Sequence, residues 1–391
     1  MNEISAKSSR KRPHRAPPAK YPEGVSDPRG LDPAAYHSPE LYQRELERIF
    51  AREWLCIGRV EDVSRPGDFV SVDIVGEPLV MVRDLEGKLR VHSRICRHRS
   101  MVICEGAGNA RSFMCPYHAW TYGLDGRLAG APEMEFTPGF DRAACTLVGP
   151  KVEVWEGFVF VNFDKDAAPL APRLTNIQAF YKNWNFADHV SVRSYEFDVP
   201  WNWKVMCENY IEAYHHIGAH RLSLEPVMPT RLVRVEDIDG PFTICHMPHI
   251  EDEEVSGFYS TGEVEPKLPR IPGLTEAERT RGSLNHIFPF LLISTYPDRM
   301  EYYLNFPLGP DRMRTRKIFC VPKDVIGKPE FEPALKVATE QYLKFRLEDV
   351  GVNNGIMAGV RSRYAERGRM CHLERPLWQF RQWWEERMGL G

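Results

Sequence analysis

The stretch CRHRSMVICEGAGNARSFMCPYH, from Cys96 to His118, decides the fold of the first half of the chain. It contains a Cys96-x-His98 motif and, after residues 99–114, a Cys115-x-x-His118 motif. Classical zinc fingers keep two cysteines together and two histidines together, whereas each half here supplies one thiolate and one imidazole. This division is typical of an asymmetric 2Fe–2S cluster with two cysteines on one iron and two histidines on the other. A structural zinc site is the alternative.

The sequence around this stretch predicts a small all-β domain over residues 51–165. The segment Gly67–Cys96 alternates apolar and polar residues and is interrupted by Gly76 and Gly87, as in short antiparallel strands joined by turns. Asp125-Gly126 is a strong hairpin signal. The four candidate ligands are therefore expected on loops of this domain.

The residues before the β domain predict two further segments. Ser38 precedes apolar residues at helical spacing and has the residue type of an N-cap, so an N-terminal helical segment is expected over residues 28–50. Residues 1–27 are rich in Lys and Arg at their start and predict a solvated, disordered basic tail.

Composition narrows the functional classes. A chain of 391 residues with 43% hydrophobic residues has room for two domains with a real core. No run approaches the roughly 18 apolar residues of a membrane-spanning helix, and a net charge of −3 gives no reason to expect a nucleic-acid partner. The nine cysteines and the lack of a secretory apolar segment favour the reducing cytoplasm of a bacterium.

The second half of the chain predicts a catalytic domain over residues 166–391. Residues 201–220 and 332–364 have helical patterns, whereas residues 286–308 and 312–322 read as strands of a larger antiparallel sheet. Residues 250–282 are charged and proline-dotted and are expected to form a partly mobile loop. The predicted fold class is α+β, with a small all-β domain followed by a large antiparallel sheet flanked by helices.

A second metal site is indicated in NWKVMCENYIEAYHHIGAH, residues 202–220. On an ideal helix Glu208, Glu212 and His215 lie within about 60° of one another, but His220 lies about 140° beyond His215. We therefore expect the helix to break between the two histidines, at Gly218. Two imidazoles need one carboxylate to form the facial triad of an oxygen-activating Fe(II) site.

The segment LEDVGVNNG offers two candidates for that carboxylate, Glu348 and Asp349. The neighbouring His216 is interpreted as an ordinary buried or surface side chain.

At this point a family resemblance is clear. CRHR…GxG…CPYHAW and NWKV..ENY.E.YH....H resemble the Rieske non-haem iron oxygenases, the ring-hydroxylating oxygenase α subunits. The resemblance covers about residues 38–220 and 345–380 and implies a helix-grip-like catalytic domain. It implies a Rieske 2Fe–2S cluster and a mononuclear Fe(II), with Cys96, His98, Cys115 and His118 holding the cluster, Tyr117 and Trp120 beside it, and His215, His220 and Asp349 holding the iron, with Glu348 as the fallback. Glu212, Glu208 and Asn209 are then the candidate catalytic residues.

The sequence departs from the family pattern in three places. Many relatives carry Gly where this chain has Ala119, and relatives that read E-x-x-Q after the Glu-Asp pair differ from Asn354 and Met357 here. Many aromatic-ring dioxygenases carry Asp at the position of Glu212, and the glutamate resembles the choline, carnitine and betaine oxygenase branch. We expect Glu212 to accept a hydrogen bond from His215 and to connect it to a cluster histidine of the next protomer, with Glu208 as the rival.

The resemblance implies a terminal oxygenase that uses O2 and electrons from a separate ferredoxin and/or flavin reductase, because the chain has no dinucleotide or flavin motif. It also implies a homotrimer. We expect hydroxylation or oxidative demethylation of an aromatic or other apolar small organic substrate; cis-dihydroxylation of an aromatic ring and quaternary-amine monooxygenation are alternatives, and a Rieske electron-transfer protein is the non-enzyme alternative.

Each of two sets of residues allows two interpretations. Basic residues beside the cluster ligands form either a docking face for an acidic electron donor or a solvated loop; they are Arg97, Arg99 and Arg111. Aromatic residues of the predicted strands either line a substrate pocket or pack in the core; they are Phe288, Phe290, Tyr296, Tyr302 and Tyr303.

Overall fold

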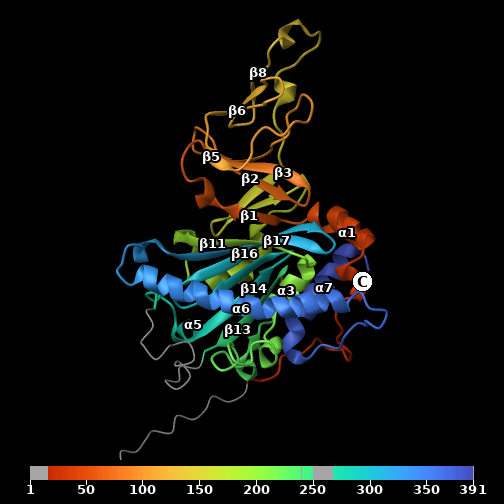
Figure 1. Ribbon diagram of the computed structural model, residues 1–391, viewed down its shortest axis with the longest axis vertical. Helices are drawn as coiled ribbons and strands as arrows, with labels where there is room; N and C mark the ends of the chain where they lie inside the picture. The colour runs from red at the N-terminus through yellow and green to blue at the C-terminus, as the bar shows by residue number, and fades with distance from the viewer. Residues whose placement is uncertain (1–15, 239, 250–266, 391) are drawn as a thin grey trace, which may run out of the picture.

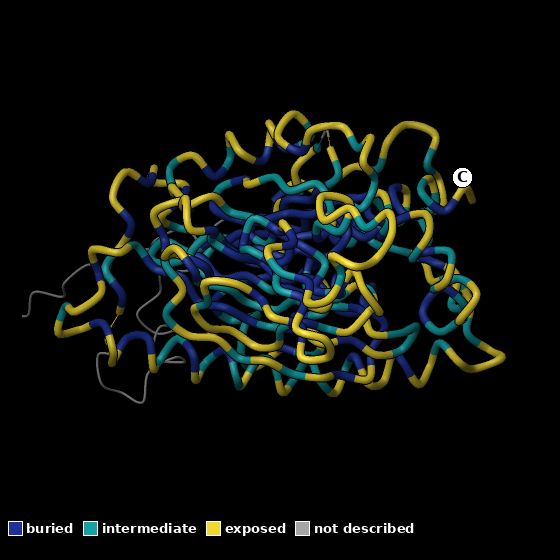
Figure 2. The backbone as a smooth tube through the Cα atoms, turned by 90° about the horizontal axis from the view of Figure 1, so that it is seen from above, coloured by how far each residue is buried: buried dark blue, intermediate teal, exposed yellow. Residues whose placement is uncertain are grey.

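The computed structural model describes residues 16–238, 240–249 and 267–390. Figure 1 shows an elongated molecule in which a small β domain stands at one end of a larger domain built on a twisted sheet. Seen from above, buried backbone gathers in the centre of the molecule and exposed backbone forms its rim (Figure 2). The fold is the predicted α+β fold, so that prediction is confirmed.

The small domain consists of short antiparallel strands in three sheets. The first has the order β1–β10–β9, the second β4–β3–β2–β5 and the third β6–β7–β8. Their bounds are β1 Leu55–Arg59, β2 Asp68–Ile74, β3 Glu77–Arg83, β4 Leu89–Ser93, β5 Ala107–Asn109, β6 Ser112–Met114, β7 Thr121–Gly123, β8 Leu128–Gly130, β9 Lys151–Trp155 and β10 Phe158–Asn162. The alternation of apolar and polar residues predicts these strands because successive side chains of a strand point to opposite faces.

The larger domain contains a seven-stranded antiparallel sheet in the order β11–β17–β16–β15–β14–β13–β12. Its strands are β11 His189–Val199, β12 Arg234–Val235, β13 Phe242–Pro248, β14 Arg281–Ile287, β15 Leu291–Thr295, β16 Met300–Gly309 and β17 Arg312–Pro322. The long helix α6 (Phe331–Gly359) runs across one face of this sheet, with α3 (Trp203–Ile211) beside it (Figure 1). None of the described helices is long and apolar enough to cross a membrane.

The two faces of the sheet meet different partners. Tyr302 packs in a buried cluster with Phe158 of β10 and Ile177 of α2 (Thr175–Tyr181). The next residue, Tyr303, lies on the opposite face, opposite Lys317 in the register of β16 and β17. Adjacent strand residues must point to opposite faces, and this alternation places Tyr303 and Lys317 on the side covered by α3 and α6.

The remaining helices lie around these sheets. They are α1 Pro39–Glu45, α5 Glu276–Arg279 and α7 Arg375–Met388, together with the π-helical turn η2 Leu46–Phe50. Short 3-10 turns connect them, namely η1 Pro33–Tyr36, η3 Val60–Val63, η4 Met134–Phe136, η5 Ala143–Cys145, η6 Ala171–Leu174, η7 Phe186–Asp188, η8 Tyr214–Ile217, η9 Thr230–Leu232, η10 Lys323–Val325 and η11 His372–Glu374. Ser38 caps α1 by accepting a hydrogen bond from the Leu41 N–H, as predicted.

The N-terminal segment differs from the prediction in part. Residues 1–15 of the expected disordered tail lie outside the described residues. Residues 16–27, however, contact the catalytic domain: the Ala16 N–H donates to the Arg231 carbonyl, and Tyr21 donates to the Cys371 carbonyl and packs edge-on against Trp378. These contacts extend the ordered chain beyond the expected start at residue 28.

The predicted mobile loop at residues 250–282 is also only partly covered by the structure. Residues 250–266 lie outside the described residues. The described end of the segment contains α5 and the start of β14, so the strand region begins earlier than the predicted residue 286. Thr275 forms a capping box with Glu278, which starts α5 in this otherwise polar segment.

The helix that carries the second metal motif ends earlier than predicted. It ends at Ile211, and Glu212 adopts an extended backbone conformation, so the break does not lie at Gly218. The Glu212 carboxylate accepts the backbone N–H groups of Tyr214 and His215. A side chain that takes these N–H groups competes with the helical hydrogen bonds and stops the helix. Glu208, Glu212 and His215 therefore do not share one helix face.

Candidate metal centres

Two loops of similar construction bring the four cluster candidates together. In the first, the Cys96 N–H donates to the Met101 carbonyl and the Ser100 N–H donates to the Cys96 carbonyl. In the second, the Cys115 N–H donates to the Trp120 carbonyl and the Ala119 N–H donates to the Cys115 carbonyl. Each loop thus turns tightly around its cysteine, as a site made of two equivalent halves requires.

Ala119 occupies a position whose backbone favours glycine. Its φ angle is +58°, in the left-handed region that costs a residue with a Cβ about 1–2 kcal/mol. Glycine adopts this conformation without that cost. We expect Ala119→Gly to raise the free energy of unfolding by about 0.5–1 kcal/mol.

The measurement for this substitution is the urea midpoint for loss of the folded β domain's circular dichroism. Ala129→Gly is the matched control, because Ala129 lies exposed on strand β8 with ordinary φ and should lose about 0.5–1 kcal/mol instead. A lower midpoint for Ala119→Gly than for the parent chain would contradict the assignment of backbone strain to Ala119.

The two cysteines and the two histidines lie in different environments. Cys96 and Cys115 are buried among apolar side chains, whereas His98 and His118 are exposed at the tip of the domain with ring centroids 4.7 Å apart. Tyr122 is buried at the base of the site, 3.3 Å from the Cys96 Sγ atom. The donor set is therefore divided into a thiolate pair inside and an imidazole pair outside.

Two aromatic residues pack against the exposed histidines. Trp120 stacks on the His98 ring with centroids 4.8 Å apart, and Tyr117 stacks on His118 at 3.7 Å. Arg99 donates a hydrogen bond to the Tyr117 hydroxyl over 2.9 Å. These contacts hold both rings facing outward.

This division fits a two-iron cluster and not a single zinc ion. A tetrahedral zinc site needs its four ligand atoms around one point. Here the two cysteines are buried and the two histidines are exposed, so the four donors form two separate pairs. A 2Fe–2S group with separate Cys and His ends has the required extended ligand set.

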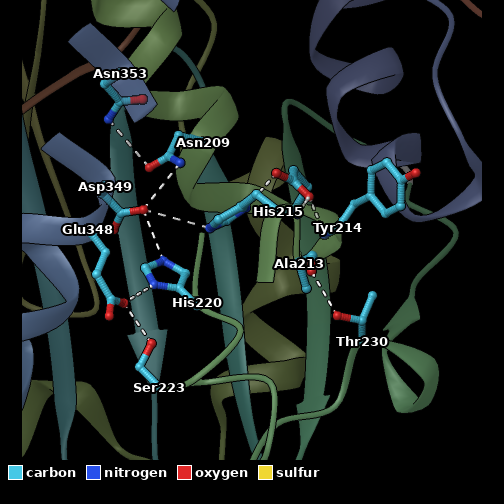
Figure 3. A network of polar contacts seen from close by, with 11 residues as sticks. Asn209, Ala213, Tyr214, His215, His220, Ser223, Thr230, Glu348, Asp349 and Asn353 are labelled. Carbon is cyan, nitrogen blue, oxygen red and sulfur yellow. Dashed lines mark hydrogen bonds and ion pairs between the residues drawn. The ribbon is translucent and has the colours of Figure 1, made fainter. Parts of the chain in front are cut away.

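The second group converges on one point. His215 comes from η8, His220 follows it in the chain, and Asp349 comes from the middle of α6 (Figure 3). The Asp349 Oδ1 atom lies 3.0 Å from the His220 Nε2 atom and 3.8 Å from the His215 Nε2 atom. Two imidazoles and one carboxylate on one side of a space match the donor set of a facial triad for Fe(II).

Carboxylates hold the outer nitrogen of each histidine. The His215 Nδ1–H donates to Glu212 over 2.5 Å, and the His220 Nδ1–H donates to Glu348 over 2.5 Å. Ser223 also donates to Glu348 (Figure 3). A proton fixed on Nδ1 leaves the Nε2 lone pair free for a metal. Of the two predicted carboxylate candidates, Asp349 therefore lies beside the Nε2 atoms and Glu348 lies behind His220.

The remaining predicted residues divide between this site and the core. Asn209 donates to Asp349 over 3.3 Å and accepts from Asn353. Glu208, by contrast, accepts a hydrogen bond from Tyr36 and contacts neither histidine among the described residues. Burial raises the pKa of Glu208 to about 7, against the Tyr36 hydrogen bond and the charge of Lys204. Glu208 therefore does not belong to the catalytic group predicted from the sequence.

A cavity of about 140 Å³ opens onto the two histidines and Asp349, between the sheet and α6. Tyr296 and Tyr303 line it, as the pocket interpretation expected. Phe288, Phe290 and Tyr302 pack in the core instead. His216 also borders the cavity and is buried; burial holds its pKa well below the ordinary value, so it is a neutral imidazole.

The sequence reasoning missed four charged residues that line this cavity, namely Arg299, Glu301, Lys317 and Arg346. Charged residues on a strand usually face water, and no local motif marks these. The available signal for Glu301 was its two-residue spacing from Tyr303 on β16, which places both side chains on one face of the sheet.

Comparison with known proteins decides the family. The profile of the ring hydroxylating alpha subunit catalytic domain matches residues 186–390, which is more than half of the chain. The profile of the Rieske [2Fe-2S] domain matches residues 53–141. This chain belongs to the ring-hydroxylating alpha subunit family. The predicted family, with its Rieske 2Fe–2S cluster and mononuclear iron, is thereby confirmed, and the zinc alternative is excluded.

Curated relatives of this alpha subunit fall into two groups. It is 34% identical over 193 residues to the carnitine monooxygenase oxygenase subunit of Acinetobacter pittii (strain PHEA-2), which is 47% of this chain and 51% of that protein. It is 35% identical over 200 residues to the biphenyl 2,3-dioxygenase subunit alpha of Rhodococcus jostii (strain RHA1), which is 48% of this chain and 42% of that protein. The chain spans about half the length of the curated relatives it matches.

Solved structures share the fold of this alpha subunit over most of its length. The quaternary ammonium Rieske monooxygenase CntA in complex with L-carnitine matches with a TM-score of 0.75 and 23% identity over 92% of this chain and 96% of that one. Naphthalene 1,2-dioxygenase from Rhodococcus sp. matches with a TM-score of 0.75 and 21% identity over 92% and 94%.

Proposed function

We propose that this chain is the terminal oxygenase component of a multi-protein system that oxygenates a small organic substrate with O2. The observation that carries the proposal is the cavity that opens onto His215, His220 and Asp349, in a chain that also carries the divided Cys and His set. An electron carrier needs only that second set. When bound, the two metal groups supply electron storage and oxygen activation.

In this proposal the residues have distinct tasks. Cys96, His98, Cys115 and His118 hold the cluster, and His215, His220 and Asp349 hold the iron. Glu212 and Glu348 keep a proton on the Nδ1 atom of each iron histidine and fix the ring orientation. Asn209 orients Asp349 by donating its amide N–H to Oδ1, the oxygen that also faces the two histidines.

The reaction we propose is hydroxylation or oxidative demethylation of an aromatic or other apolar compound. The aromatic walls of the cavity support a substrate of this kind. Two alternative reactions follow from the names of the relatives. The dioxygenases suggest cis-dihydroxylation, and the carnitine monooxygenases suggest oxidation of a quaternary amine.

Electron delivery is proposed to cross between subunits of a homotrimer. The loops that would hold the cluster, between β4 and β5 and between β6 and β7, belong to the small domain, which stands away from α3 and α6 (Figure 1). Large exposed apolar side chains accompany both sites: Met101, Met114 and Tyr117 near the cluster, and Tyr214, Ile217 and Leu222 near the iron histidines. Such surfaces favour contact with another chain, and one structure of a quaternary ammonium Rieske monooxygenase that shares this fold is described as giving insights into inter-subunit electron transfer.

The other proposed partners follow from the electron requirement. A ferredoxin and/or flavin reductase would supply electrons, and the exposed Arg97, Arg99 and Arg111 offer it a basic face. The described residues offer no sign of a nucleic-acid or membrane partner. The nine cysteines are all described and all free of disulfides, which supports a location in a bacterial cytoplasm.

The test is a substrate screen with the metal-loaded chain, NADH and a surrogate ferredoxin and reductase. Oxygen uptake coupled to a hydroxylated, demethylated or dihydroxylated product is expected, together with about three irons per chain. About two irons per chain and no oxygenated product would identify an electron carrier and contradict the proposal.

A further inference from the structure

The end of the cavity opposite the iron histidines is built from buried charges. Glu301 accepts from Arg299 over 2.6 Å through one oxygen and pairs with Lys317 over 2.8 Å through the other. Burial alone would raise the pKa of Glu301, but Lys317 and Arg299 hold it below its ordinary value. Burial lowers the pKa of Lys317, and the charge of Glu301 opposes that shift. Both carboxylate oxygens of Glu301 are in use.

The aromatic rings beside this group already hold a cation. The Lys317 Nζ atom lies 4.2 Å from the ring centroid of Tyr303, 5.4 Å from that of Tyr342 and 5.6 Å from that of Phe319. A quaternary ammonium substrate needs free aromatic faces or a free carboxylate. At these three rings the protein's own ammonium group already lies beside a face, and it would repel a second cation there.

Two donors at this end lack full partners. An ammonium group has three N–H donors, and among the described residues Lys317 pairs only with Glu301. The Tyr342 hydroxyl is buried, 8% of the residue being exposed, and has no hydrogen-bond partner in the described chain. The Tyr303 hydroxyl lies close to it, but no hydrogen bond of normal geometry joins the two. Both side chains line the cavity, so an acceptor there would satisfy them.

The balance of charge in the cavity also favours an anion. Its lining includes three cationic side chains, those of Arg299, Lys317 and Arg346. Its carboxylates are Glu301, which is fully paired, and Asp349, which belongs to the proposed iron site. A negative group near Lys317 would therefore gain attraction in a site shielded from water.

The size of the cavity limits the body of the substrate. An apolar cavity of about 150 Å³ is large enough to bind benzene. The cavity here has about 140 Å³, which is close to the volume that binds one aromatic ring.

We propose that the substrate of this chain is a single-ring aromatic carboxylate. Its carboxylate accepts hydrogen bonds from the Lys317 ammonium and the Tyr342 hydroxyl, and its ring extends toward His215, His220 and Asp349. This inference rests on the proposed function for the use of the cavity as a substrate site. It goes beyond that function because it excludes quaternary amines and neutral hydrocarbons as the preferred class.

The test is isothermal titration calorimetry on the metal-loaded chain with three single-ring probes: benzoate, benzamide and phenyltrimethylammonium. Benzoate is expected to bind about 10- to 100-fold more tightly than benzamide, because a hydrogen bond to a charged group is worth more than a neutral one. Phenyltrimethylammonium is expected to bind most weakly. Equal affinities, preferred binding of the cation, or no binding of benzoate would overturn the proposal.

Substitutions test whether the benzoate carboxylate binds at the end of the cavity that holds Lys317 and Tyr342. Lys317→Met should remove the preference for benzoate over benzamide, and Tyr342→Phe should weaken benzoate binding by about 3- to 10-fold. Tyr181→Phe is the matched control, since Tyr181 also has a buried hydroxyl without a partner in the described chain but packs in the core behind the sheet. Unchanged benzoate binding in both cavity variants would mean that benzoate binds elsewhere, for example on the iron, and would overturn the proposal.

The calorimetry does not depend on turnover, so the two proposals can fail separately. Charge-selective binding through Lys317 without any oxygenated product would contradict the terminal oxygenase and leave the binding site intact. Oxygenation of neutral compounds only, with no preference for benzoate, would support the oxygenase and contradict the aromatic carboxylate.

Discussion

Asp349→Ala is expected to abolish oxygenation while the visible absorption of the cluster remains unchanged. Asp349 supplies the one carboxylate beside the Nε2 atoms of His215 and His220, and two imidazoles alone hold Fe(II) poorly. Iron content should fall from about three to about two per chain, because the cluster keeps its own two. His220→Ala should behave in the same way.

The neighbouring carboxylate provides the matched control. Glu348→Gln changes the adjacent residue of α6, but Glu348 contacts the Nδ1 side of His220 and not the space between the Nε2 atoms. We expect this variant to keep its iron, with affinity reduced by about 10- to 100-fold because His220 loses its anionic acceptor. Full activity of Asp349→Ala beside an iron-free Glu348→Gln would reverse the assignment of the two carboxylates.

Glu212→Gln is expected to slow electron transfer from the reduced cluster to the iron by about 100-fold while both metals stay bound. One carboxylate oxygen of Glu212 accepts the His215 Nδ1–H, and the other accepts two backbone N–H groups. The first oxygen has one lone pair left, which we propose accepts the free N–H of His98 or His118 of the next protomer. An amide of the same shape lacks the charge that strengthens both bonds.

The measurement is a single turnover of pre-reduced enzyme, with the cluster's reoxidation followed by absorbance. Glu208→Gln is the control, because Glu208 was the rival in the sequence and its carboxylate contacts Tyr36 instead. A normal reoxidation rate in Glu212→Gln would contradict the proposal that Glu212 connects His215 to a cluster histidine of the next protomer. A slow rate in Glu208→Gln and a normal one in Glu212→Gln would transfer the role to Glu208.

The parts of this molecule that were predictable from sequence depend on local patterns. The Cys and His spacing and the alternation of residues 67–96 predicted the β domain, because ligand loops and strands leave signals within a few residues. The end of α3 was not predictable in this way. The helix ends where the Glu212 carboxylate accepts nearby backbone N–H groups. Helix propensities do not include this competition between a side chain and the helical hydrogen bonds.

The cavity could not be predicted from the sequence, because it forms only when strands that are far apart in the chain pair in one register. Alternation indicates that Tyr302 and Tyr303 point to opposite faces, but it does not tell which face meets α6. Lys317 and Glu301 are sixteen positions apart in the chain and become partners only when β16 and β17 pair. Their charges would ordinarily have placed both residues in water.

Helix α6 carries Tyr342 and Asp349 on one face, seven residues apart, which is about 10.5 Å along its axis. One end of the proposed substrate is thus fastened to the same rigid rod that holds the iron. The helix therefore fixes the distance between the Tyr342 hydroxyl and the proposed iron ligand Asp349, and Lys317 on β17 supplies the second fixed contact. Exchanging other residues that line the cavity should change which compounds bind, whereas the ring carbon that is oxidised should change when the spacing between these two anchors and Asp349 changes.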